Sequence, residues 1–462
     1  MTGKHKERTS TLITFSLLTI LLLLSGCSRS TTPPLTIGVI GDQTGTENLD
    51  AAYAILDSAI QRINQRDPQV VIHVGDLVES IKDIDGFETY QKNFQRATEL
   101  LDQLKAPWYL TAGDHDVNPP NFLANSPDRS REKWFQELCA EYGLPVKEHL
   151  YYSKDVRGYH FIFLYSIEQL HSDPRWGPIF LDHISQQQQE WLADDLEKHK
   201  DAYGIVVVIH HPLWYVDSWW QPVHALLRQY PVTAVIAGHY HYDQCDQLLD
   251  GIQYYVMGAT GGTVKNSDPA SGGVAEYGMM TIQGRKVLDF TLRSVMTDDT
   301  LELTPRISMD RIQALSSMFS NLWSDENLHW DGNRVVTIAP NGSHIPVTHI
   351  GLESLGNPLD IPIEMEMVSY SSGLINPRWM LKDGAVEANA GITLQPAERI
   401  GWANLTSVGN WRTPSSLFVA DLAPDLTKAS PPLEITLKTR FEDIRPRWIE
   451  YKATYKITNV TN

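Results

Sequence analysis

The chain has 462 residues, of which 42% are hydrophobic and 20% charged, and its formal net charge is −18. This composition has room for more than one hydrophobic core, so it excludes an intrinsically disordered chain and a single small module. The acidic balance of 56 Asp and Glu against 38 Lys and Arg argues against nucleic acid as the main partner, because phosphate backbones are bound by clustered cations.

The first segment has the pattern of an export signal. Lys4, Lys6 and Arg8 precede an apolar stretch over residues 12–24, and the stretch ends in Leu-Ser-Gly-Cys, with the cysteine at position 27. A charged region, an apolar region and small residues at a cleavage site follow one another in secretory signals. The thirteen positions from 12 to 24 are short for a bilayer span, so a transmembrane anchor is the weaker interpretation.

This segment resembles the lipobox of bacterial lipoproteins. The resemblance implies that residues 1–26 are a signal peptide and that Cys27 carries lipid, including palmitate. The expected product is an exported, membrane-anchored lipoprotein, in the periplasm or on the cell surface. Residues 27–34 are polar with two prolines and are expected to form a tether. Whether Cys139 and Cys245 pair in that oxidising setting is left open by the sequence.

From residue 35 to about 297 the pattern alternates between strands and helices, which predicts an α/β domain with largely parallel strands. The predicted strands are Leu35–Ile40, Val70–Val74, Trp108–Thr111, Tyr159–Tyr165, Ile205–Ile209 and Val232–Ala237. The helical periodicity covers Leu49–Ile63, Phe87–Leu104, Arg131–Tyr142 and Gln186–His199. Three later runs, Gln253–Met257, Tyr277–Ile282 and Val287–Val295, follow without helices and predict a second, more antiparallel sheet.

The pattern of the sequence changes after residue 297. Residues 298–332 are expected to form a helical connector, with the helix over Ile312–Trp323. Residues 333–462 contain short alternating runs broken by Pro, Gly and Asn, which predicts a C-terminal β-sandwich. The clearest of these runs are Val335–Ala339, Ile363–Ser369, Ile435–Thr439 and Trp448–Ile457.

Five of the predicted strands end in a turn that carries Asp or His. The turns are Gly41-Asp42, Gly75-Asp76, Gly113-Asp114-His115-Asp116, His210-His211-Pro212 and Gly238-His239-Tyr240-His241. Taken singly, an Asp after Gly is most often a turn former or a helix cap. Ligands of open α/β sheets bind beyond the carboxyl ends of the strands, so these side chains are expected to converge on one crevice. Carboxylates and imidazoles together suit two ions such as Mn, Fe, Zn or Mg.

In this order the motifs resemble those of the calcineurin-like metallophosphoesterase family, which is marked by an Asp, a GD, a GNH[DE], a His and a GHxH sequence. The resemblance covers residues 35 to about 297. Further similarity to the purple acid phosphatase branch lies in residues 151–153, 210–215 and 250–254. The resemblance implies a four-layer αββα sandwich and a hydrolase that cleaves phosphate mono- or diesters, so the expected substrate is a phosphate ester.

Carried over residue by residue, the resemblance implies a centre of two metal ions, with Fe, Mn or Zn as the expected elements. The ligands that it assigns are Asp76 as the bridge, Asp42 and His241 on one ion, and Asp114, His210 and His239 on the other. A hydroxide between the ions would attack phosphorus, and His115 would stabilise the transition state or protonate the leaving oxygen. Asp116 is either a partner of His115 or only a cap of the following turn.

The sequence departs from the family at two positions. Thr44 stands where the family usually has a His, and Asp114 replaces the asparagine of GNHD. The purple acid phosphatases also lack that His and place a Tyr three residues after the bridging Asp, where this chain has Glu79. Glu79 is therefore either a ligand of the first ion or a solvated acid in the next helix. The departures also leave open a catalytically degenerate lipoprotein that acts as a binding or surface module.

Other polar and aromatic residues have plainer interpretations. His73 and His160 lie inside apolar strands and are expected to be core histidines. An aromatic group follows the His210 turn and is either a wall for a nucleoside, sugar or aryl group, or packing under a long loop. Its members are Trp214, Tyr215, Trp219 and Trp220.

Overall fold

The structure is a computed structural model, and most of the chain from residue 32 to residue 457 is described. The described ranges are 32–46, 48–79, 86–118, 128–146, 148–168, 170–173, 177–180, 184–215, 219–246, 248–264, 273–320, 328–332, 334–338, 341–353, 357–381, 384–396, 416–427, 430–431 and 433–457. The predicted signal peptide, Cys27 and most of the predicted tether lie outside them. None of the described helices combines the length and the hydropathy that a bilayer-spanning segment needs.

The first of two six-stranded sheets begins with the first predicted strand. Its strand order is β14 (Thr300–Leu301), β13 (Lys286–Ser294), β12 (Glu276–Gln283), β1 (Leu35–Ile40), β2 (Val70–His73) and β3 (Trp108–Leu110). β1, β2 and β3 run parallel, whereas β12 pairs with β1 in the antiparallel sense. Three carboxyl ends therefore open onto one edge of this sheet.

The second sheet has a parallel centre and antiparallel edges. Its order is β10 (Gln244–Cys245), β11 (Gln253–Val256), β9 (Val232–Ala237), β8 (Ile205–Val208), β5 (Tyr159–Phe163) and β4 (Tyr152–Val156). The late strands do not form a sheet of their own, so that prediction is wrong. β11 runs parallel to β9 here, while β12 and β13 extend the first sheet. Strand partners are chosen by long-range pairing, which local periodicity does not report.

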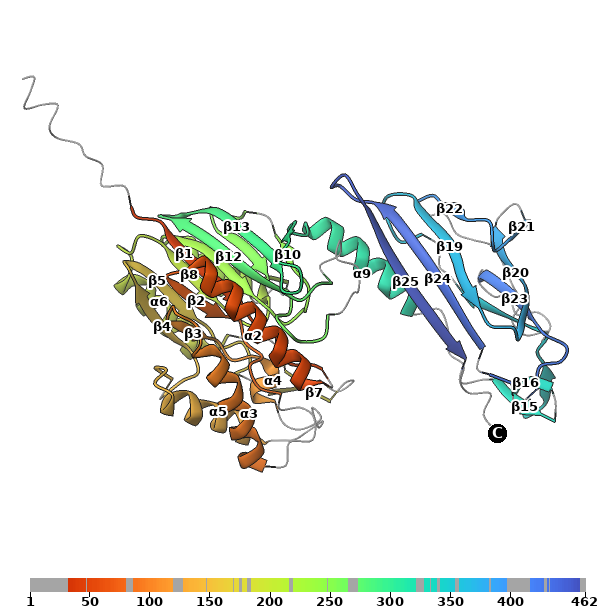
Figure 1. Cartoon of the computed structure of the whole chain (residues 1–462), viewed down its shortest axis with the longest axis horizontal. Helices are drawn as coiled ribbons and strands as arrows, with labels where there is room; N and C mark the ends of the chain where they lie inside the picture. The colour runs from red at the N-terminus through yellow and green to blue at the C-terminus, as the bar shows by residue number, and fades with distance from the viewer. Residues whose placement is uncertain are drawn as a thin grey trace, which may run out of the picture.

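Helices cover the two outer faces, which produces the predicted four layers (Figure 1). The helices on the first sheet are α2 (Leu49–Arg66), α3 (Gly86–Leu101) and α5 (Ser130–Glu141), and the main helix on the second is α6 (Gln186–Lys198). Alternate residues of β5 divide between the layers. Phe161 and Phe163 join the core shared with the first sheet, and Ile162 packs with Leu192 of α6. The predicted fold class is confirmed.

Short elements fill the connections. They are α4 (Asp114–Val117), β6 (Leu170–Asp173), β7 (Gly177–Phe180), the 3-10 turn η2 (Leu213–Tyr215), the π-helical turn η3 (Trp220–His224) and α8 (Ala225–Leu227). Trp214 and Trp219 near the second sheet are 2% and 1% exposed, so these two side chains are packing rather than a ligand wall. Cys139 and Cys245 are both free thiols.

The C-terminal part consists of one helix followed by strands. Helix α9 (Arg306–Ser320) begins six residues before the helix that periodicity predicted. One three-stranded sheet contains β15 (Leu328–Asp331), β16 (Arg334–Ile338) and β17 (His344–Pro346). Two four-stranded sheets follow, in the orders β18 (His349–Glu353), β23 (Ser416–Leu422), β20 (Leu374–Leu381), β21 (Gly384–Glu387), and β22 (Ile392–Leu394), β19 (Ile363–Tyr370), β24 (Leu433–Glu442), β25 (Trp448–Ile457).

The two four-stranded sheets share one hydrophobic core. Trp379 of β20 and Ala420 of β23 are buried in the same cluster as Met365 of β19 and Leu437 of β24. Residues of two sheets in one core are the arrangement of a sandwich.

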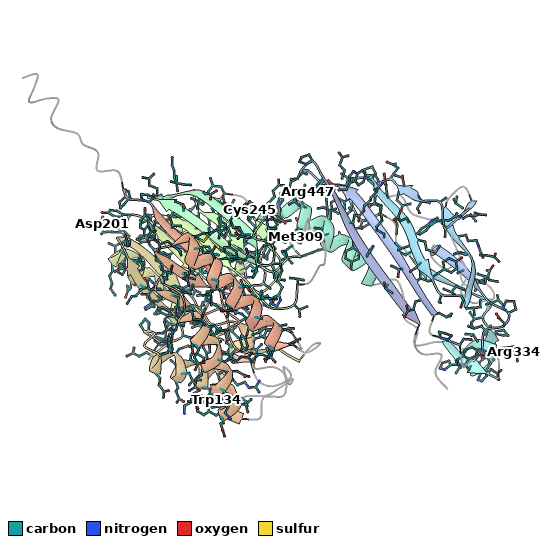
Figure 2. All side chains as sticks on the ribbon, viewed as in Figure 1. Trp134, Asp201, Cys245, Met309, Arg334 and Arg447 are labelled. Carbon is teal, nitrogen blue, oxygen red and sulfur yellow. The ribbon has the colours of Figure 1, made fainter. Side chains whose placement is uncertain are left out.

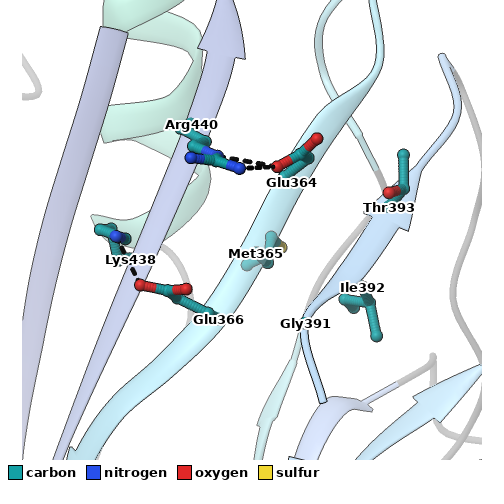
Figure 3. Close-up of a pocket in the computed structure, with 8 residues that line it drawn as sticks. All are labelled: Glu364, Met365, Glu366, Gly391, Ile392, Thr393, Lys438 and Arg440. Carbon is teal, nitrogen blue, oxygen red and sulfur yellow. Dashed lines mark hydrogen bonds and ion pairs between the residues drawn. The ribbon is translucent and has the colours of Figure 1, made fainter. Parts of the chain in front are cut away.

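Cross-strand ion pairs line a shallow cavity of 310 Å³ on the sheet that contains β19 and β24 (Figure 3). Arg440 Nε donates to Glu364 Oε2 over 2.7 Å, and Lys438 Nζ lies 2.5 Å from Glu366 Oε1. Both pairs join residues that the register of β19 and β24 places opposite one another. The charges of this surface therefore stabilise the sheet they belong to.

A separate network of His and Asp lies at the amino-terminal end of β5. His160 is 1% exposed and lies between two carboxylates, with Nδ1 2.7 Å from Asp155 Oδ1 and Nε2 2.8 Å from Asp195 Oδ2. The ring of His199 stacks on that of His160, with 3.7 Å between centroids and 13° between planes. His160 is thus a buried, paired histidine, as its apolar strand predicted.

Candidate metal centre

The six predicted ligands lie in the turns that follow five strands. Asp42 follows β1, Asp76 follows β2 and Asp114 begins α4 after β3. The three histidines come from the second sheet, with His210 after β8 and both His239 and His241 after β9. Since these strands are parallel within each sheet, their carboxyl ends meet in one crevice.

Asp42, Asp76 and His210 form one group of potential ligand atoms, all within 4.8 Å of one another. His241 reaches the same carboxylates, because its Nε2 is 3.6 Å from Asp42 Oδ1. The carboxylates of Asp42 and Asp76 are 0% and 1% exposed. Asp42, Asp76 and His241 are the ligands predicted for the first ion, whereas His210 was predicted for the second and belongs to both groups.

Asp114, His210, His211 and His239 form a second group within the same 4.8 Å limit. Nε2 of His210 is 2.9 Å from Asp114 Oδ1 and 3.3 Å from Asp76 Oδ1, so Asp76 lies beside both groups. Nδ1 of His239 is 3.1 Å from the same Asp114 oxygen. The structure therefore brings all six predicted ligands together and adds His211, which was not among the predicted ligands.

Backbone carbonyls orient two of the imidazoles. Nδ1 of His210 is 2.8 Å from the carbonyl oxygen of Val74, and Nδ1 of His241 is 2.6 Å from that of Thr263. An Nδ1–H that donates to a carbonyl leaves Nε2 as the coordinating nitrogen, and metal-bound histidines are commonly held this way. In both residues Nε2 is the atom that faces the carboxylates.

The turns carry unusual backbone conformations. Asp42, Asp76, His239 and His241 all have positive φ, at 55°, 61°, 72° and 56°. Such residues are strained by about 1–3 kcal/mol each unless the surroundings hold them, and they gather at functional sites. Two glycines that precede predicted ligands are required because a Cβ would collide with another predicted ligand. A Cβ on Gly238 would lie 2.3 Å from Asp42 Oδ2, and a Cβ on Gly113 would lie 2.1 Å from Asp76 Oδ1.

The donor set fits cations. In the described part of the chain, Oδ2 of Asp42 and Oδ2 of Asp76 are buried without a hydrogen-bond partner. Burial raises the pKa of Asp42 to about 8, and Asp76 adds to the rise. Uncompensated buried carboxylates are costly, and bound cations would stabilise them in the charged form. Thr44 is 1% exposed, and its Oγ1 is also buried without a partner there.

His115 lies at the edge of the centre, with its side chain 18% exposed. Its backbone N–H donates to Asp76 Oδ1 over 2.9 Å, and its Nδ1 is 3.0 Å from Glu79 Oε1. Burial alone would lower the pKa of His115, but Asp76, Glu79 and Asp114 outweigh it and raise this pKa to about 10. A protonated imidazole in this position can stabilise an anion or donate a proton.

Glu79 is the partner of His115, a role that the motifs did not predict. It is 3% exposed, so the interpretation as a solvated acid is wrong. Its Oε2 accepts a hydrogen bond of 2.9 Å from the N–H of Gly45, and its other oxygen faces His115. The carboxylate is therefore aimed at the predicted proton donor rather than placed within the two ligand groups.

Asp116 is not the partner of His115. Its carboxylate accepts hydrogen bonds from three backbone N–H groups, those of Asp76 at 3.0 Å, Val78 at 2.7 Å and Gly113 at 2.8 Å. These bonds tie the turn that carries Asp76 to the turn that carries Asp114. Asp116 therefore fixes the distance between two predicted ligands.

The turn after β9 is also tied to the C-terminal part of the chain. Asp243 is 2% exposed and accepts hydrogen bonds from Thr304, from the N–H at 2.6 Å and from Oγ1 at 3.2 Å. Tyr242 packs in the hydrophobic core of the C-terminal sheets, and its hydroxyl accepts from Gln313 of α9 over 2.5 Å. Figure 2 places Cys245 and Met309 together at this junction.

His73 lies near the centre without joining it. Nε2 is 2.8 Å from Gln43 Oε1, and Nδ1 accepts from the N–H of Gly75 over 3.1 Å. Burial and then the charge of His210 lower the pKa of His73 to about 3, so it is neutral. This agrees with the expected core histidine.

Comparisons with known proteins point the same way. Purple acid phosphatase 23 of Arabidopsis thaliana is 25% identical over 276 residues, which cover 51% of this chain and 54% of the plant protein. Tartrate-resistant acid phosphatase type 5 of Homo sapiens is 24% identical over 268 residues, which cover 52% of this chain and 76% of the human protein. The chain thus spans about half the length of the plant relative.

Among solved structures, a purple acid phosphatase from yellow lupin seeds aligns with a TM-score of 0.43 and 14% identity, over 60% of this chain and 55% of that one. The family model described as calcineurin-like phosphoesterase matches residues 35–243, which contain all six predicted ligands. This match supports the resemblance that the motifs predicted, over residues 35–243 of the chain.

Proposed function

We propose that the chain is a metal-dependent phosphoesterase that hydrolyses phosphate mono- or diesters at a centre of two ions. The observation that carries the proposal is Asp76, which lies beside both ligand groups and has one buried oxygen without a hydrogen-bond partner among the described residues. Asp76 can therefore contribute to both groups. Fe, Mn and Zn suit the mixture of imidazole and carboxylate ligands.

The side chains have separable tasks in this proposal. Asp42 and His241 hold one ion, and Asp114, His210 and His239 hold the other. Bound ions supply a nucleophile from water at neutral pH and neutralise the phosphoryl oxygens. His115, kept in place by Glu79, donates a proton to the leaving oxygen. The buried walls of the crevice strengthen each of these electrostatic interactions.

A hydrolysis assay tests the proposal. The chain without residues 1–26 is treated with a chelator, reloaded with Mn²⁺, Fe²⁺ or Zn²⁺, and assayed on p-nitrophenyl phosphate and bis(p-nitrophenyl) phosphate. We expect activity that disappears on chelation and returns on reloading. A protein that binds two ions and hydrolyses neither ester would instead be a binding or surface module.

We also propose that the protein is exported and anchored to the membrane through lipid on Cys27. The support is the order of the charged residues, the apolar stretch and Leu-Ser-Gly-Cys in the sequence. Mass spectrometry of the mature chain is expected to find residues 1–26 removed and a lipidated Cys27. A chain that keeps these residues would contradict the proposal, and Cys27→Ser is expected to remain unprocessed.

A further inference from the structure

His211 follows the predicted ligand His210 and lies inside the second ligand group. It is 3% exposed, and its ligand atom is within 4.8 Å of those of Asp114, His210 and His239. Its ring centroid is 4.1 Å from that of His239, and Nε2 is 3.9 Å from Asp114 Oδ1. No motif gave this residue a role.

The distance from His211 Nε2 to Asp114 Oδ1 fits two atoms that coordinate the same ion. At 3.9 Å the pair is too long for a hydrogen bond. Two atoms that each coordinate one ion at about 2.0–2.2 Å lie roughly 3–4 Å apart. His210 Nε2 and His239 Nδ1 lie nearer to the same oxygen, at 2.9 Å and 3.1 Å, so nitrogens of three histidines surround Asp114 Oδ1 within 3.9 Å.

The far side of the His211 ring has a fixed hydrogen-bond partner. Nδ1 is 2.8 Å from Oγ of Ser166, a residue that is fully buried. The same hydroxyl accepts a bond of 3.4 Å from the N–H of His211. In the tautomer whose Nδ1–H donates to Ser166, the lone pair of Nε2 is directed to the Asp114 side, which is the arrangement that the carbonyl of Val74 imposes on His210.

We propose that His211 is an additional ligand of the ion held by Asp114, His210 and His239. This inference rests on the two-ion centre of the proposed function. With Asp76 the ion would then have five protein ligands, three of them imidazoles, and one position left for water or a phosphate oxygen. Three imidazoles favour Zn²⁺, Fe²⁺ or Co²⁺ over Mg²⁺, which prefers oxygen ligands.

The test is a metal titration of the chelated protein by calorimetry, with Zn²⁺ and with Mg²⁺. The wild type is measured first and is expected to bind two Zn²⁺ ions; if it binds none, the two-ion centre itself fails and His211 is not the cause. In His211→Phe, which keeps an aromatic ring without a ligand atom, Zn²⁺ affinity at one site is expected to fall by about 100-fold or more, with the other site unchanged.

Further variants separate ligation from packing. His211→Gln serves if the Phe ring disturbs the fold, which circular dichroism reports. Ser166→Ala is expected to weaken the same site by about tenfold, since it only orients the ring. His224→Gln is the matched control, because His224 is buried and bonded to Tyr254 in the second sheet. Wild-type Zn²⁺ affinity at both sites in a folded His211→Phe, or an equal loss in His224→Gln, would overturn the proposal.

Discussion

One cluster of His and Asp lies at the amino-terminal end of β5, and the other lies at the carboxyl ends of β1, β2, β3, β8 and β9. The two clusters differ in what their oxygens touch. At the amino-terminal end of β5, Asp195 binds Ser153 with Oδ1 at 2.9 Å and His160 with Oδ2 at 2.8 Å. At the carboxyl ends, Asp42 and Asp76 each keep a buried oxygen without a hydrogen-bond partner among the described residues. The first cluster is satisfied by protein alone, and the second is complementary to cations.

Ring orientation separates the clusters as well. The rings of His160 and His199 stack within 13° of parallel. Asp155, His160 and His199 also offer ligand atoms within 4.8 Å of one another, but both nitrogens of His160 are already bonded to carboxylates. The rings of His210 and His239 meet at 74°, and both direct a nitrogen to Asp114. Residue composition alone does not distinguish an ion-pair network from a metal site; unsatisfied oxygens and convergent nitrogens do.

The largest effect is expected when the carboxylate of Asp76, which lies beside both ligand groups, is removed. Asp76→Ala is expected to lose both ions and to lower kcat/KM by about a thousandfold or more, because Asp76 borders both groups. Elemental analysis and an ester assay measure the two effects. Asp195→Ala is the control from the other cluster, and its metal content is expected to stay unchanged. Two retained ions with normal turnover in Asp76→Ala would place the chemistry elsewhere.

Removing the proton donor tests whether holding ions and reacting are separate tasks. His115→Ala is expected to keep both ions and to lower kcat by about 10²–10⁴-fold, because general acid catalysis contributes that much. The loss should be smaller for an ester with a good leaving group, such as p-nitrophenyl phosphate, than for an alkyl phosphate. An equal loss on both esters would argue against proton donation by His115.

A variant of Glu79 tests whether this residue is a metal ligand or only the partner of His115. Since its carboxylate faces His115 and Gly45, Glu79→Gln is expected to keep two ions and lower kcat by about 10–100-fold. Metal analysis together with steady-state kinetics distinguishes the roles. A fall in occupancy from two ions toward one would make Glu79 a ligand after all.

The hydrogen bonds from Thr304 to Asp243, in the turn after β9, predict a smaller effect on metal affinity. Asp243→Asn weakens the bonds to Thr304 that hold the turn with His239 and His241, so metal affinity is expected to fall by about tenfold. Calorimetric titration measures it. Asp360→Asn is the control, because it breaks a bond to Arg311 of α9 without touching that turn. Equal affinities in both variants would show that the tie does not reach the metals.

The cluster of His160, Asp155 and Asp195 should contribute to the free energy of unfolding, and this contribution should depend on pH. Burial opposes the shift, but Asp195 and Asp155 raise the pKa of His160 above its ordinary value. A raised folded-state pKa gives stability that is complete below about pH 6.5 and lost as pH rises through the folded value. The melting temperature of the wild type should therefore exceed that of His160→Gln most at pH 5–6. Each kcal/mol of unfolding free energy that the variant loses is expected to lower its melting temperature by about 2–4 °C.

This pH dependence has a clear opposite outcome. A difference between the wild type and His160→Gln that widens toward pH 9 would show that His160 is neutral in the folded protein. Metal content and ester hydrolysis of His160→Gln at pH 7 are expected to match the wild type, because His160 lies at the amino-terminal end of β5, whereas the predicted ligands follow the carboxyl ends of other strands.

Much of the fold and the centre could be predicted from the sequence. Runs such as Val232–Ala237 are buried strands because they are short and β-branched, and this one matches β9 at both ends. A turn after a parallel strand can only open onto the carboxyl edge of the sheet, so the order of Asp and His motifs was enough to predict the six residues that the structure brings together.

The tertiary structure alone decided the rest. Whether β12 extends the first sheet depends on pairing with a strand more than two hundred positions away, and no local pattern records it. The partner of Glu79 and the tie from Asp243 to Thr304 depend on where side chains point near turns with positive φ. The place of His211 depends on the turn after β8. Such turns have no fixed period, so the direction of a side chain there follows only from the packing around it.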